Sequence, residues 1–109
     1  MIHNSSFIDP SAIIAKDVNI GPFCHIGKNI VIESGCIIAS HVVMNDNVTC
    51  KANVRIFSHV NLGNHLAQIT IGENTHIREF SLLGTDSDNN KAVTIEPVSY
   101  THLTLPTKA

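Results

Sequence analysis

Residues 19–44 read NIGPFCHIGKNIVIESGCIIASHVVM, and an apolar residue recurs at every sixth position. The period covers eleven consecutive steps of the chain, all apolar and eight of them isoleucine: Ile2, Ile8, Ile14, Ile20, Ile26, Ile32, Ile38, Met44, Cys50, Ile56 and Leu62. A period held over so many steps is an internal repeat, and an internal repeat indicates the fold more strongly than local propensity does.

A six-residue period fits a strand, because six is a multiple of the two-residue pleat, whereas on a helix these residues would scatter around the axis. The position two residues before each step is apolar as well: Ala12, Val18, Cys24, Ile30, Cys36, Val42, Val48, Val54 and Val60. Each hexad therefore predicts a short strand with one apolar face, which must stack on its neighbours to be buried.

We expect an all-β fold, a left-handed parallel β-helix of about four to five coils with three hexads per coil. The left-handed winding follows from a resemblance to known hexapeptide-repeat solenoids, and an ordinary β-sandwich is the alternative. Residues that tolerate positive φ are expected to form the corners. They are Gly21, Gly27, Asn29, Gly35, Asn45, Asn47 and Asn53.

The period slips after Leu62. Gln68 occupies the next core step, and Ile71 and Ile77 restart the period three residues late, which predicts a short insertion at residues 64–67. Residues 1–97 are predicted to form the hexapeptide-repeat domain. Residues 98–109 lose the pattern and are predicted to be a foreign or disordered tail, with a genuine C-terminal extension as the alternative.

Composition excludes several classes of function. The net charge is −2 and no cluster of Lys and Arg is present, so nucleic acid is not an expected partner. No apolar run is long enough to insert into a membrane, and no signal peptide is visible, so we expect a cytoplasmic protein. The three cysteines lie at core positions, which is typical of buried thiols in a reducing compartment, and no metal or other cofactor is predicted.

Histidines offer one hypothesis for a metal site. His41 and His59 are 18 residues apart, so they should stack at an outward position on adjacent coils, and His65 lies in the insertion. The γ-class carbonic anhydrases are hexapeptide solenoids that bind zinc through three histidines. The alternatives are a solvated or interface-facing ladder of His41 and His59, and a substrate contact by His59 or His65.

Several segments resemble one family of enzymes. They are residues 7–14, 19–27 and 40–45, and residues 71–74 followed by 77–80. They are similar to the acyl-carrier-protein–UDP-N-acetylglucosamine O-acyltransferases, hexapeptide-repeat enzymes that begin lipid A synthesis, over residues 2–85. The resemblance implies the N-terminal part of a homotrimeric enzyme, with a nucleotide sugar and acyl carrier protein as its substrates.

The resemblance also implies a mechanism, in which a histidine general base deprotonates the sugar hydroxyl that attacks the acyl thioester. In that family the base belongs to a later coil, in an Ala-His-Ile-Ala-His-type segment. The chain contains no such segment, so we name no catalytic residue and expect the chain as given to be inactive.

Substrate contacts are expected on the corners and loops where the repeat is interrupted. The candidate residues are His59, Asn64, His65, Arg78, Glu79, Gly84 and Thr85. Another hexapeptide-repeat acyl- or acetyltransferase, acting on a different sugar nucleotide, is the alternative function.

Overall fold

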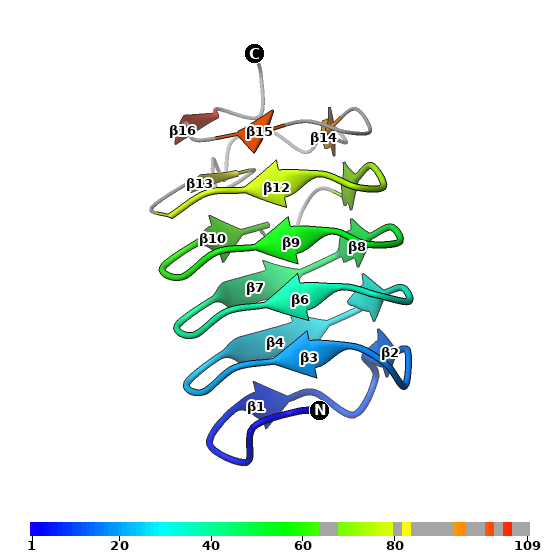
Figure 1. The fold of residues 1–109 in the computed structure, drawn as a ribbon, viewed down its shortest axis with the longest axis vertical. Coiled ribbons are helices and arrows are strands. Elements are labelled where there is room, and N and C mark those ends of the chain that lie inside the picture. Colours follow the sequence, from blue (N-terminus) through cyan, green and yellow to red (C-terminus); the bar gives the residue numbers. More distant parts are fainter. Residues whose placement is uncertain (64–67, 80–81, 84–92, 96–99, 102–103, 106–109) are drawn as a thin grey trace.

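Strands of two to four residues stack into three parallel sheets that run along one axis (Figure 1). The computed structural model describes residues 1–63 and 68–79, and beyond them the strands at 82–83, 93–95, 100–101 and 104–105. The described residues form strands, turns and bends, with no helix among them. The chain visits the three sheets in turn, which confirms the predicted β-solenoid.

The first sheet contains β1 (Phe7–Ile8), β4 (His25–Lys28), β7 (Val43–Asp46), β10 (Asn61–Leu62), β13 (Leu82–Leu83) and β16 (Thr104–Leu105). The second sheet contains β2 (Ile13–Ile14), β5 (Val31–Ile32), β8 (Val48–Cys50), β11 (Ile69–Ile71) and β14 (Val93–Ile95). The third sheet contains β3 (Asn19–Ile20), β6 (Ile37–Ile38), β9 (Arg55–Ile56), β12 (His76–Ile77) and β15 (Tyr100–Thr101).

The register between coils shows where the repeat is interrupted. Paired residues are 18 apart through the first coils, as for Ile8 and Ile26, and still for Leu62 and Met44. For β11, β12 and β13 the spacing to the preceding coil is 21, as for Ile69 and Val48. This confirms the three-residue insertion that the slip after Leu62 predicts.

Two short strands, β15 and β16, fall within residues 98–109 and pair in parallel with β12 and β13. The division at residue 97, with residues 98–109 as a foreign or disordered tail, stays a prediction.

The core is the apolar ladder that the sequence predicts. Both apolar positions of each hexad, from Val18 through Leu62, are at most 3% exposed, and Ile69, Ile71 and Ile77 continue the core after the insertion. Ile8 and Ile14 are only partly buried against this core, whereas Ile2 is exposed. Since successive strand residues point to opposite faces, the other residue of each pair faces outward.

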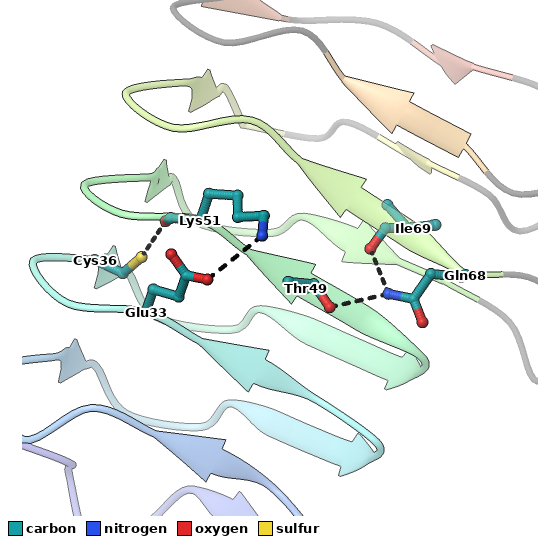
Figure 2. Close-up of polar contacts among 6 residues, drawn as sticks. All are labelled: Glu33, Cys36, Thr49, Lys51, Gln68 and Ile69. Carbon is teal, nitrogen blue, oxygen red and sulfur yellow. Dashed lines mark hydrogen bonds and ion pairs between the residues drawn. The ribbon is translucent and has the colours of Figure 1, made fainter.

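Gln68 occupies a core step by counting but is exposed in the structure. Its Nε2 donates to Thr49 Oγ1 at 3.0 Å on the preceding coil and to Ile69 O at 3.1 Å (Figure 2). The core step moves to Ile71, which pairs with Cys50, and Ile69 fills the other buried position of this hexad, opposite Val48. On the same sheet, the Lys51 ammonium lies 3.6 Å from the Glu33 carboxylate, an exposed ion pair that contributes less than ~1 kcal/mol.

The corners agree with the predicted residues only in part. Left-handed φ is found at Asn29, Gly35, Asn47 and Asn53, as expected, but not at Gly21, Gly27 or Asn45. Gly21 and Gly27 instead lie where a side chain would contact the backbone of the adjacent coil. A Cβ on Gly27 would lie 1.6 Å from the backbone O of Asn45, one coil away.

All three cysteines are buried and unbridged. The Cys36 thiol donates to Lys51 O at 3.1 Å (Figure 2). The Cys24 thiol donates to Ala39 O at 2.9 Å. Burial raises the pKa of Cys36 and, more strongly, that of Cys50, because the charged thiolate would lose its hydration. The thiols therefore act as small apolar groups of the core.

This burial predicts alkaline destabilisation. Below pH ~8.5 the Cys36 and Cys50 thiols are protonated in both the folded and unfolded states, so the stability does not change with pH through these two groups. As pH rises further, only unfolded thiols ionise, and the free energy of unfolding should fall by about 1.4 kcal/mol per pH unit for Cys50. Urea unfolding at several pH values measures this slope, and Cys50→Ala should reduce it. An unchanged slope in that variant would contradict the assignment.

Candidate functional site at one corner of the solenoid

The tripeptide Ser-His-Val occurs twice, at residues 40–42 and 58–60, 18 residues apart. Each copy follows a strand of the third sheet, β6 or β9, and leads into the first sheet, so the two copies lie on adjacent coils at one corner. The Oγ atoms of Ser40 and Ser58 are 3.2 Å apart. The rings of His41 and His59 stack with centroids 4.9 Å apart, which confirms the predicted histidine ladder.

Phe23 extends this ladder on the coil before, with its ring centroid 5.2 Å from that of His41. We call this column of rings, Phe23, His41 and His59, the corner ladder. Phe23 is 62% exposed, and both histidines are exposed as well. The ladder therefore presents ring edges to solvent along one edge of the solenoid.

The backbone of the corner ladder is unusual. Phe23, His41 and His59 have φ of 59°, 58° and 61°. At the other two corners, every left-handed residue among those described is asparagine or glycine, namely Asn29, Asn47, Gly63, Gly35, Asn53 and Asn74. Residues other than glycine rarely adopt this conformation, although histidine does so more often than phenylalanine, and strained backbone concentrates at functional sites. Among the described residues, this corner is the one where phenylalanine and histidine, and not asparagine or glycine, have left-handed φ.

Arg78 and Glu79 follow strand β12 on the next coil. Phe57 N donates to Ile77 O at 2.9 Å, so Arg78 continues the chain beside Phe57, the residue that precedes Ser58 and His59. The Arg78 Cζ atom lies 4.5 Å from the Phe57 ring centroid, and its Nε donates to Glu79 Oε1 at 3.2 Å. Both side chains are about half exposed, at 51% and 42%.

The structure thus brings His59, Arg78 and Glu79, three of the predicted site residues, to neighbouring coils at one end of the third sheet. Asn64, His65, Gly84 and Thr85 lie outside the described residues. Ser40, Ser58 and Phe57 belong to the same surface and were not predicted. The repeated Ser-His-Val tripeptide could have identified the two serines.

The corner presents hydroxyls, imidazoles and a guanidinium, which can donate to and accept from a polar ligand such as a sugar or a phosphate. For a metal, the described residues contain no group of three or more His, Cys, Asp and Glu side chains close enough to hold an ion. His65, the third histidine of the metal hypothesis, lies outside them. In the described part of the chain, no helix is long and apolar enough to cross a membrane.

Comparison with known proteins relates the chain to a class of enzymes. Residues 2–108 match the family described as the GMPPB C-terminal domain. The acyl-[acyl-carrier-protein]–UDP-N-acetylglucosamine O-acyltransferase of Bartonella quintana is 35% identical over 103 residues, which cover 86% of this chain and 38% of that protein. The chain therefore spans less than half the length of this curated relative.

Two solved acyltransferase structures are also similar to this chain. LpxA from Acinetobacter baumannii superposes with a TM-score of 0.84 and 30% identity, covering 96% of this chain and 46% of that one. The UDP-N-acetylglucosamine acyltransferase of Francisella novicida superposes with a TM-score of 0.79 and 34% identity, covering 88% of this chain and 39% of that one. These structures confirm the left-handed β-helix, and the comparisons do not favour the carbonic-anhydrase alternative.

Proposed function

The chain belongs to the family described as the GMPPB C-terminal domain, with acyltransferases among its homologues, and we propose that it is the N-terminal part of an O-acyltransferase. The enzyme transfers an acyl chain from acyl carrier protein to a UDP-amino sugar, the first step of lipid A synthesis. The single observation that supports this most is the superposition of this chain on acyltransferase structures at 30% and 34% identity.

In this reaction the sugar hydroxyl oxygen attacks the thioester carbonyl. A C–O bond forms, the C–S bond breaks, the hydroxyl proton passes to a base, and acyl carrier protein leaves as a thiol. We place the base outside these 109 residues, so the chain itself should show no turnover. The complete enzyme is proposed to be a cytoplasmic homotrimer.

We assign the corner to the nucleotide sugar. Two hydroxyls, from Ser40 and Ser58, and two imidazoles, from His41 and His59, lie in register along about two coils. Their spacing suits a ligand with many hydrogen-bonding groups, and Arg78 supplies a positive charge next to Phe57, the residue that precedes Ser58. The strained backbone at His41 and His59 is then explained by the need to direct these rings outward.

His59→Ala tests this assignment. We expect the variant to bind UDP-N-acetylglucosamine five- to tenfold more weakly, since one hydrogen bond contributes about 1 kcal/mol. Titration of the isotope-labelled chain, followed by NMR, measures the dissociation constant.

His25→Ala is the matched control, because His25 is an exposed histidine that stacks on Phe7 and lies outside the corner ladder. Equal weakening by both variants would contradict the assignment. Preference for a GDP-sugar over the UDP-sugar in the same titration would favour the alternative acyl- or acetyltransferase. Turnover by the 109-residue chain with acyl carrier protein thioester would overturn the placement of the base.

A further inference from the structure

We draw no further inference here: the strongest candidate, the exposed patch of rings that Phe7 and His25 form on the outer face of the first sheet and Phe23 continues at the adjoining corner, carries none, because nothing in the described part of the structure shows what covers it.

Discussion

Gly27→Ala is expected to destabilise the chain by about 4 kcal/mol or more, although the substitution adds a single methyl group. Gly27 lies in β4, and its φ is not left-handed, so alanine could adopt the backbone without torsional strain. The added Cβ would nevertheless lie 1.6 Å from Asn45 O and 2.8 Å from Asn45 C on the adjacent strand β7. Because the obstructing atoms are backbone, the two coils must separate.

The consequences should extend beyond one pair of strands. The Asn45 side chain donates through Nδ2 to Asn61 Oδ1 at 2.9 Å and to Gly63 O at 2.9 Å on the following coil. Displacing Asn45 therefore disturbs three consecutive coils and their hydrogen bonds. Since a solenoid is stabilised by contacts between neighbouring repeats, loss of one interface uncouples the coils on either side.

Gly21→Ala is the control for this prediction. Its Cβ would meet Ala39 C and Ser40 N at 3.1 Å, a tight contact that a shift of a few tenths of an ångström relieves. We expect a loss of about 1 kcal/mol. Urea unfolding followed by circular dichroism gives both values, and equal midpoints for the two variants would show that coil spacing does not depend on Gly27.

The sequence predicts the solenoid well because the decisive interaction, burial of one apolar face, has the same period as the backbone. Ile26, Ile32 and Ile38 could be assigned to the core by counting alone. Counting also located the slip at Gln68 and the restart at Ile71, which is buried and pairs with Cys50. Corners were harder to assign, because glycine has two different uses in this fold. Gly35 adopts a left-handed φ, whereas Gly27 allows two coils to approach closely.

The site was predicted less completely than the fold, for a physical reason. Stacking of His41 on His59 follows from an uninterrupted spacing of 18, so it could be predicted. Contact of Arg78 with Phe57 depends on a spacing of 21 across the insertion and on the rotamers of two long side chains. The spacing of apolar residues along the sequence does not predict which outward side chains meet across the insertion. The Arg78–Phe57 contact follows from the register between coils in the structure.

Ile38→Ala is expected to cost 2–5 kcal/mol, the usual loss for truncating a fully buried isoleucine. Ile38 is 1% exposed and belongs to the core ladder between Ile20 and Ile56, its partners on the adjacent strands of the third sheet. Alanine would remove three carbons from the centre of a closely packed prism, and the surrounding strands cannot close the space without shifting whole coils.

Ile37→Ala is an unusually close control, because Ile37 is the same residue type in the same two-residue strand. It is 38% exposed and faces outward, so its truncation should cost no more than about 1 kcal/mol. The difference in free energy of unfolding between the two variants measures the burial of one strand face against the other. Equal losses would mean that the outward face of the third sheet is also covered in solution. That result would indicate association of chains through this face, which sedimentation at several protein concentrations would detect.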